Sequence, residues 1–361
     1  MANADEVQKL IFKSGLPPGD IIMLTAAVRD LHRIYPERFM TDVRTSYPEL
    51  WENNPYITPL NENDPTCRVI EFSYPLIDLC NDSPVHFLEG FLEYLRFELG
   101  VPLKPTSFGG DIHLSDTERI SPGPIEQLVG TDVPYWIIVS GGKYDFSVKW
   151  WRHGRYQEVV DRFAGKILFV QTGQPGAFHP PLDGVIDLRG KTSLRELVRL
   201  VYFADGVLCP ITMLMHLAAA VEDQPETSRA CVTIAGGREP VTWPSYPQHQ
   251  FLHTIGALRC CATGGCWKGR VSKLNDGHDS DDPSNFCESV TPDGQPQCMD
   301  MIHVNQVCEA ISLYYSGDIR RFCNSSDLEV SRGHLSRTLA DQLQVQTRSL
   351  TSVENAQSLT T

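Results

Sequence analysis

The sequence predicts an α/β protein composed of two doubly wound units. Short apolar runs alternate with segments whose apolar residues recur at helical spacing, first within residues 7–100 and again within residues 134–235. Alternation of this kind is typical of parallel sheets covered by helices on both faces. The length of 361 residues exceeds what one typical hydrophobic core requires, which favours two units over one.

The first unit opens with a strand, a turn and a helix. Residues 7–12 are predicted to form the strand, residues 14–20 hold the Gly and Pro of a turn, and residues 21–35 carry apolar side chains at helical spacing. The pattern continues with an extended run, a helical stretch, a strand and a helix at residues 39–43, 48–53, 67–72 and 86–100. Residues 101–133 are rich in Pro, Gly and Asp and are predicted to connect the units, and we place the first unit at residues 1–125.

The second unit, residues 126–255, repeats the alternation. Helices are predicted near residues 155–163 and after Ser193, which forms a capping box with Glu196. Strands are predicted at residues 134–139, 166–171, 185–188, 206–210 and 230–235. Because ligands of such sheets bind beyond the carboxyl ends of the strands, we expect a ligand cleft between the two units.

The junction between the strand at 206–210 and the next helix is a candidate anion site. The chain turns at Pro210 and enters a helix near Met213, so free backbone N–H groups and the positive end of the helix dipole meet there. Thr212 can cap the helix and offer its hydroxyl to a phosphate, and His216 leans back toward the same end. The alternative is that Thr212 only caps the helix and His216 is a core histidine with a satisfied hydrogen bond.

Two further segments carry candidate chemistry. Asp20 follows Gly19 at the opening of the first helix and faces the expected cleft, where it can act as a general base toward a hydroxyl group or simply cap the helix. Gly142 and Lys143 follow a strand, with Lys149 downstream, and glycine backbone with two ammonium groups suits a bound anion. A solvated loop is the alternative for Lys143.

A cysteine-rich segment, residues 256–303, follows the second unit. It holds five of the eleven cysteines, and we expect four of them to bind one zinc or iron ion in a tetrahedral site, namely Cys261, Cys266, Cys287 and Cys298, with Cys260 as the alternative to Cys261. Residues 304–323 are predicted to form a closing helix. Residues 324–361 are polar and are predicted to form a flexible tail, with a weak helix at residues 328–345 as the alternative.

Composition excludes several classes of partner. A net charge of −14 argues against nucleic acid, since phosphate backbones are bound through an excess of Lys and Arg. The sequence has no signal-peptide pattern at its start and no apolar run of the ~20 residues needed to span a bilayer. We therefore expect a cytoplasmic protein without a transmembrane segment, and a homo-oligomer is left open.

These motifs resemble those of a known family. Gly19-Asp20 opening the first helix, Lys149-Trp150 after a glycine loop, and Thr212 ahead of His216-Leu217-Ala218-Ala219 resemble, in order and spacing, the ADP-heptose glycosyltransferases of family 9. The segment with Gly265-Cys266-Trp267, Cys287 and Cys298 is similar to the metal-binding finger of bacterial autotransporter heptosyltransferases, a branch of that family. The resemblance spans about residues 7–315 and implies a GT-B fold, in which two Rossmann-like domains face a cleft.

The resemblance also implies an activity, namely inverting transfer of a heptose or related sugar from an ADP-sugar to a hydroxyl acceptor. The acceptor would be a protein Ser or Thr, a saccharide or a small molecule. Asp20 would be the catalytic base and Lys149 would neutralise the leaving diphosphate, which would also be surrounded by Gly19, Gly142, Lys143, Pro210, Thr212, Met213 and His216.

The sequence leaves two other functions open. The first is a catalytically inactive, metal-stapled scaffold or nucleotide-binding module. It is favoured by Ile211, which stands where the family carries a carboxylate. The second is a zinc-dependent hydrolase, which is disfavoured because the cysteine cluster lacks the His and carboxylate ligands and the open position of a catalytic zinc site.

Overall fold

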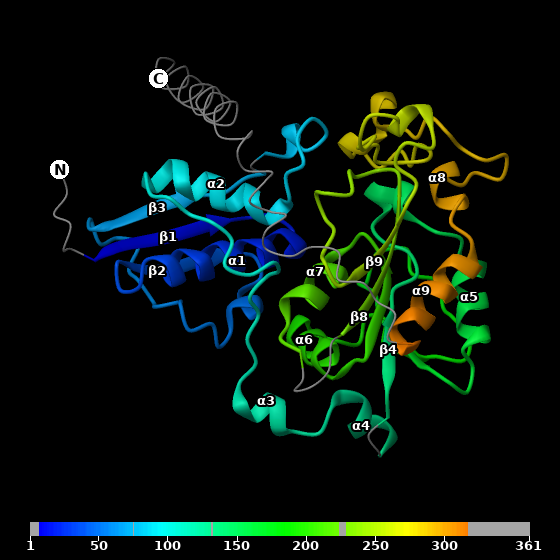
Figure 1. Ribbon diagram of the computed structural model, residues 1–361, viewed down its shortest axis with the longest axis horizontal. Coiled ribbons are helices and arrows are strands. Elements are labelled where there is room, and N and C mark those ends of the chain that lie inside the picture. Colours follow the sequence, from blue (N-terminus) through cyan, green and yellow to red (C-terminus); the bar gives the residue numbers. More distant parts are fainter. Residues whose placement is uncertain (1–6, 75, 131–132, 224–228, 317–361) are drawn as a thin grey trace.

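The computed structural model of the chain describes residues 7–74, 76–130, 133–223 and 229–316, and these form two parallel sheets with helices packed on them (Figure 1). The predicted α/β class is confirmed. The proposed tail at 324–361, its helix at 328–345 and residues 317–323 of the predicted closing helix lie outside the described residues. Within the described ranges, no helix has the length and apolar character required to cross a bilayer.

The first sheet has three parallel strands in the order β2-β1-β3, where β1 is Gln8–Ser14, β2 is Phe39–Thr45 and β3 is Cys67–Glu71. Its helices are α1 (Pro18–Ile34) and α2 (Phe87–Leu99), and the helical stretch predicted at 48–53 is a single 3₁₀ turn, Pro48–Trp51. The sheet is smaller than a complete doubly wound half. After α2, the chain runs along α7 (Met213–Ala220) of the second unit, where Ile112 N–H donates to Ala220 O, and does not add a fourth strand.

The second sheet has six parallel strands in the order β6-β5-β4-β7-β8-β9. Numbered along the chain, this order is 3-2-1-4-5-6, the doubly wound arrangement whose ligands bind where the order reverses, between β4 and β7. The strand β9 was not predicted. The bounds are β4 Tyr135–Ile138, β5 Leu168–Gln171, β6 Ile186–Asp187, β7 Gly206–Pro210, β8 Ala230–Gly236 and β9 His249–His253.

Helices cover both faces of this sheet. Successive side chains of a strand point to opposite faces, and in β4 the side chains on both faces are buried. Trp136 and Ile138 of β4 belong to a core shared with α5 (His153–Arg162) and α9 (Val304–Ser316). Ile137 belongs to the core of the other face, shared with α6 (Leu194–Phe203) and α7 (Met213–Ala220). The predicted capping box of α6 is present, and the connection at 101–133 holds two unpredicted short helices, α3 (Asp116–Ile120) and α4 (Pro124–Val129).

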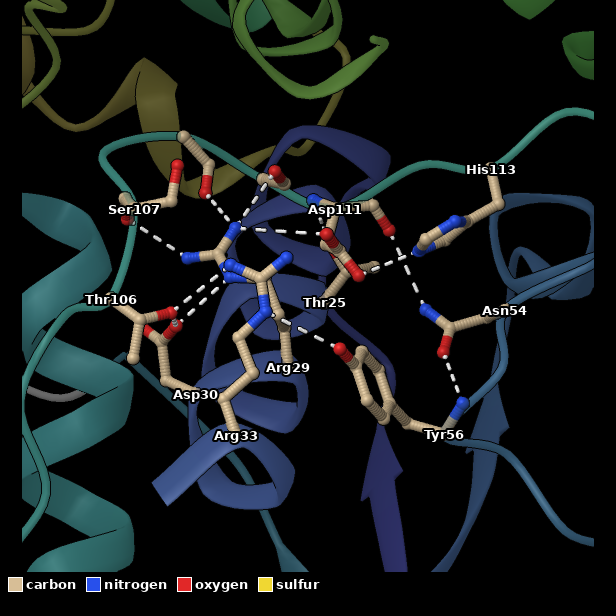
Figure 2. Close-up of polar contacts among 12 residues, drawn as sticks. Thr25, Arg29, Asp30, Arg33, Asn54, Tyr56, Thr106, Ser107, Asp111 and His113 are labelled. Atoms are coloured by element: carbon tan, nitrogen blue, oxygen red, sulfur yellow. Dashed lines mark hydrogen bonds and ion pairs between the residues drawn. The ribbon is translucent and has the colours of Figure 1, made fainter. Parts of the chain in front are cut away.

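A buried arginine on α1 fixes the segment that leads from the first sheet to the second. Arg29 donates to the carbonyl oxygens of Ser107, Gly109 and Gly110 at 2.8–3.1 Å and to the Asp30 carboxylate at 2.9 Å (Figure 2). A Cβ atom on Gly109 would lie 2.4 Å from Ala219 O of α7, so glycine allows this segment to pack directly on that helix. The network therefore holds α1 and α7 in a defined relative position.

We expect Arg29→Met to lower the free energy of unfolding by roughly 3–5 kcal/mol, the loss typical of removing one partner of a buried ion pair. The variant leaves the fully buried Asp30 carboxylate without its guanidinium partner. Urea denaturation followed by circular dichroism measures the change. Arg33→Met is the matched control, because exposed Arg33 donates to the Tyr56 and Thr106 hydroxyls and its loss should change stability by less than about 1 kcal/mol. Equal losses in the two variants would contradict this account of Arg29.

Candidate active site

A cleft of about 750 Å³ lies where the carboxyl ends of both sets of strands meet. Its volume falls within the range of small-molecule sites. The loops after β1 and β3 and the loops after β4, β7 and β8 all contribute to it. Its polar lining includes Asp20, Tyr74, Lys143, Lys149, Thr212, His216, Arg238 and Glu239. The cleft lies between the two units, where the sequence analysis expects a ligand to bind.

Asp20 lies in the first turn of α1, at the edge of the cleft. The alternative in which it caps the helix is wrong, because Pro17 is the N-cap residue and no side chain caps this helix. Its Oδ2 atom accepts a hydrogen bond from the Tyr74 hydroxyl at 2.6 Å. Burial raises the pKa of Asp20 to about 6, while the Tyr74 bond and the Lys149 charge oppose that rise. A carboxylate with such a pKa is suited to accept a proton near neutral pH.

Lys149 is part of a buried charged group. Its Nζ atom lies 2.6 Å from Oε1 of Glu239, and the same oxygen accepts from Arg238 Nη1 at 2.6 Å. Burial lowers the pKa of Lys149, with Glu239 opposing the shift. Burial alone would raise the pKa of Glu239, yet the charges of Lys149 and Arg238 hold it below its ordinary value. Two cations share one carboxylate, so the group keeps one net positive charge toward the cleft.

The N-terminus of α7 reaches the cleft beside this charged group. Thr212 is the N-cap residue, but its side chain does not cap the helix, and its hydroxyl has no hydrogen-bond partner beyond the nearby Cys209 thiol. Met213 also lines the cleft, whereas Pro210 is buried as the last residue of β7. The Lys149 Nζ atom also lies 3.4 Å from Ile211 O, so the lysine reaches the residue just before this helix tip.

His216 has the buried hydrogen bond expected of a core histidine. Its Nδ1 atom is 2.6 Å from the Tyr246 hydroxyl, and burial lowers its pKa to about 3. The ring is therefore neutral at ordinary pH and adds no charge to the cleft. Gly19 brings the two helix tips together, because a Cβ atom there would lie 3.3 Å from His216 Cδ2 and 3.5 Å from Met213 Cα.

The glycine loop after β4 forms another wall of the cleft. Gly141 has a φ of 124°, and a Cβ atom there would lie 1.9 Å from Phe178 O, so only glycine fits. Gly142 exchanges two backbone hydrogen bonds with Phe178, at 2.9 and 3.0 Å, which fixes the loop. Lys143, next in sequence, is exposed and lines the cleft, so it is available to a ligand.

Sequence reasoning missed three residues of this site: Tyr74, Arg238 and Glu239. The signal for the last two was present, because Gly236-Gly237 follows a strand just as Gly141-Gly142 does, and charged residues come next. Tyr74 lies three residues beyond β3, and its sequence neighbourhood gives no such signal.

The cysteine-rich segment encloses a small second cavity of about 10 Å³, roughly the space of a single atom. Five thiols line it, those of Cys260, Cys261, Cys266, Cys287 and Cys298. Across the residues that the structure describes, no group of three or more His, Cys, Asp or Glu side chains stands in a metal-binding arrangement. Thiols are nevertheless the soft ligands that zinc and iron prefer, and the cavity is of the size of a single ion.

Cys260 and Cys261 differ in their surroundings. The Cys261 thiol faces the carbonyl oxygens of Thr254 and Leu258, both at 3.5 Å. Cys260 is close enough to Cys266, Cys287 and Cys298 to interact electrostatically with all three. The geometry therefore favours Cys260 over Cys261, the residue that the sequence analysis preferred, as a neighbour of the other three thiols.

The segment also touches the charged group of the cleft. Trp267 N–H donates to Arg238 O at 3.0 Å, and a Cβ atom on Gly265 would lie 2.4 Å from that same oxygen. The Arg238 guanidinium lies 5.0 Å from the centre of the Trp267 ring. The cysteine-rich segment thus supports the loop that carries Arg238 and Glu239.

Residues 100–250 match the model of glycosyltransferase family 9 (heptosyltransferase). No curated protein matches the chain. This family match, together with the α/β fold and its parallel sheets, supports a glycosyltransferase.

The solved structures with a similar fold include several glycosyltransferases. A family 9 glycosyltransferase from Veillonella parvula is 14% identical, with a TM-score of 0.57 over 88% of this chain and 99% of that one. The iron-containing dodecameric glycosyltransferase TibC from enterotoxigenic Escherichia coli is 16% identical, with a TM-score of 0.57 over 87% of this chain and 77% of that one. The E. coli ADP-heptose lipopolysaccharide heptosyltransferase II is 13% identical, with a TM-score of 0.51 over 86% and 100%. At these identities the likeness concerns the fold, which is consistent with a GT-B architecture.

Proposed function

We propose that the chain is an inverting glycosyltransferase that moves a heptose, or a related sugar, from an ADP-sugar to a hydroxyl acceptor. The observation that carries the proposal is that one cleft contains a carboxylate of raised pKa, Asp20, together with the Lys149 ammonium and the N-terminus of α7. A base and a site of positive charge are what displacement of a diphosphate requires. TibC, which has a similar fold, was solved in complex with ADP-D-β-D-heptose, and this supports the choice of donor.

The proposed reaction is a single displacement. The acceptor oxygen forms a bond to the anomeric carbon of the sugar on the face opposite the ADP group, and Asp20 takes the proton of that hydroxyl. The bond between the anomeric carbon and the diphosphate oxygen breaks, and its electron pair leaves with ADP. One displacement inverts the anomeric configuration.

In this proposal, residues 126–255 bind the nucleotide sugar and residues 1–125 bind the acceptor. The diphosphate would lie between the backbone N–H groups at the tip of α7 and the ammonium groups of Lys143 and Lys149. The Thr212 hydroxyl is suited to donate to it, because no backbone group of the helix uses that hydroxyl. These groups would neutralise the charge that develops on ADP as the sugar departs.

Release of nucleoside diphosphate from a panel of nucleotide sugars tests the proposed function. The purified chain would be incubated with ADP-, GDP- and UDP-sugars, each with pools of peptide, saccharide and small-molecule hydroxyl acceptors. We expect release of ADP from ADP-heptose to exceed release from the other donors. Turnover of a GDP- or UDP-sugar with none of an ADP-sugar would contradict the proposed donor.

A nucleotide-binding module without transferase activity is a second candidate. It is favoured by the pairing of Lys149 with Glu239, which already satisfies much of that charge, and by apolar Ile211 in the anion loop. Calorimetric titration with ADP-heptose, run beside the panel, distinguishes the two functions. Binding without turnover of any donor would favour the module.

We also propose that the cysteine-rich segment holds one iron or zinc ion on Cys260, Cys266, Cys287 and Cys298. A closed site of four thiolates stabilises structure. Here it would fix the segment that supports Arg238. TibC, whose fold is similar, contains iron.

Elemental analysis of protein purified without chelator should find about one metal ion per chain. Cys260→Ser should lose most of this metal and unfold at a lower temperature, since binding of a structural metal contributes directly to folding. Cys261→Ser is the matched control and should keep the metal, because its thiol faces backbone carbonyls. Loss of metal from Cys261→Ser but not from Cys260→Ser would reverse the assignment.

A further inference from the structure

We propose that Tyr74 is a positioning residue for Asp20, whose hydroxyl holds one carboxylate oxygen so that the other receives the acceptor's proton. The inference rests on the proposed role of Asp20 as the base. It adds a residue to the reaction that the sequence motifs do not contain.

The geometry of the pair carries this inference. The Tyr74 hydroxyl donates to Asp20 Oδ2 at 2.6 Å, the short distance typical of a charge-assisted O–H···O⁻ bond. The two residues come from neighbouring strands of the first sheet, since Asp20 follows β1 and Tyr74 follows β3. Both line the same cleft, so the bond forms at the place where an acceptor hydroxyl would bind.

The surroundings of Asp20 explain why such a donor is needed. Asp20 is 9% exposed, and burial favours the neutral form of its carboxyl group. Glu239 acts in the same direction, whereas Lys149 and Lys143 favour the charged form. His216, from α7, adds no charge because its pKa lies at about 3. Among the groups that favour ionisation, the Tyr74 hydrogen bond has the largest effect.

Tyr74 is suited to remain a donor throughout the reaction. Burial and the nearby Asp20 carboxylate raise the pKa of its phenol, so the hydroxyl stays protonated and does not compete as a base. Because Oδ2 already accepts this bond, we assign the acceptor's proton to Oδ1. The fixed carboxylate also keeps its orientation, which a freely rotating aspartate would lose.

The test is the pKa of Asp20 in Tyr74→Phe, measured without substrate by NMR of ¹³C-aspartate-labelled protein, with the Asp20 signal assigned from Asp20→Asn. Removing one hydrogen bond to the charged form should raise this pKa by about one pH unit. Tyr94→Phe is the matched control, because its hydroxyl donates to Glu71 O outside the cleft, and it should leave the Asp20 pKa unchanged. An Asp20 pKa that is the same in Tyr74→Phe and in the parent would overturn the proposal.

The pH profile of transfer then connects the bond to the reaction. The acid limb of kcat/KM should move to higher pH by the same interval, so that Tyr74→Phe loses about fivefold at pH 6 and little at pH 9. A loss that is equal at all pH values would show a merely structural role and would contradict the proposal. If the NMR pKa moves while the acid limb stays in place, Asp20 is not the base, and it is the proposed function that fails.

Discussion

Asp20→Asn is expected to reduce sugar transfer by roughly 10²–10⁴-fold, the range typical of losing a general base, while ADP binding stays within a few-fold of the parent. The amide keeps the size of the side chain but cannot accept the acceptor's proton. Initial rates of ADP release and calorimetric titration with ADP measure the two quantities. Asp64→Asn is the control, because this carboxylate pairs with Lys9 away from the cleft and its loss should leave the rate unchanged. A rate for Asp20→Asn within threefold of the parent would remove Asp20 from the reaction.

The same variant should be more stable than the parent at neutral pH. The folded-state pKa of Asp20, about 6, lies above its ordinary value of 3.8, so the folded protein binds this proton more tightly than the unfolded chain does. Ionisation of Asp20 therefore lowers the free energy of unfolding progressively as the pH rises from about 4 to about 6. Asp20→Asn should remove that loss and gain about 1–3 kcal/mol at pH 8, with little gain at pH 4. Activity of the parent should fall as the pH drops below 6, because the base becomes protonated.

Lys149→Met should lower kcat/KM by at least about 100-fold, because it removes a cation from the group that we propose receives the leaving diphosphate. The variant also leaves the buried Glu239 carboxylate with Arg238 as its partner, so loss of stability could lower activity as well. Lys149→Met/Glu239→Gln separates the two effects, since it removes both charges of the ion pair. The double variant should recover stability but not activity, as measured by thermal unfolding and ADP release. Recovery of activity in the double variant would show that Lys149 serves only to balance Glu239.

The helix tip and the glycine loop that line the cleft could be predicted because their patterns are local. A strand that ends at Pro210 and a helix that begins at Met213 specify a helix tip at the carboxyl edge of a sheet. The strand followed by Gly141-Gly142 specifies a close backbone approach, and the structure places Phe178 against it. Both features, the end of a strand and a glycine at a close backbone approach, are encoded within one short segment of the sequence.

The partners of these residues could not be predicted in the same way. Lys149 and Glu239 are ninety residues apart, and they meet because β4 and β8 both flank β7 in the second sheet. Tyr74 reaches Asp20 because β3 pairs with β1. The sequence around His216 is compatible both with a residue of the anion site and with a core histidine. The Tyr246 hydroxyl, 2.6 Å from its Nδ1 atom, favours the core histidine, and this partner is distant in the sequence.

Two elements, β9 and α3, were not predicted because their sequence signals are weak. The strand β9 contains His249, Gln250 and His253 and pairs on one side only, so its apolar signal is weak. The helix α3 lies in a stretch whose Pro, Gly and Asp content indicates a loop, although Ser115 and Glu118 form a capping box there. A cap is a local signal, so this capping box indicates the helix from the sequence alone.

A crystal structure of the chain with ADP would test the central claim most directly, namely that the tip of α7 receives the diphosphate of an activated sugar. We expect the β-phosphate within hydrogen-bond distance of the backbone N–H groups at Thr212 and Met213, with the Lys149 ammonium beside it and Asp20 facing the position of the sugar. A nucleotide bound elsewhere, with the tip of α7 left empty at saturating ADP, would contradict it.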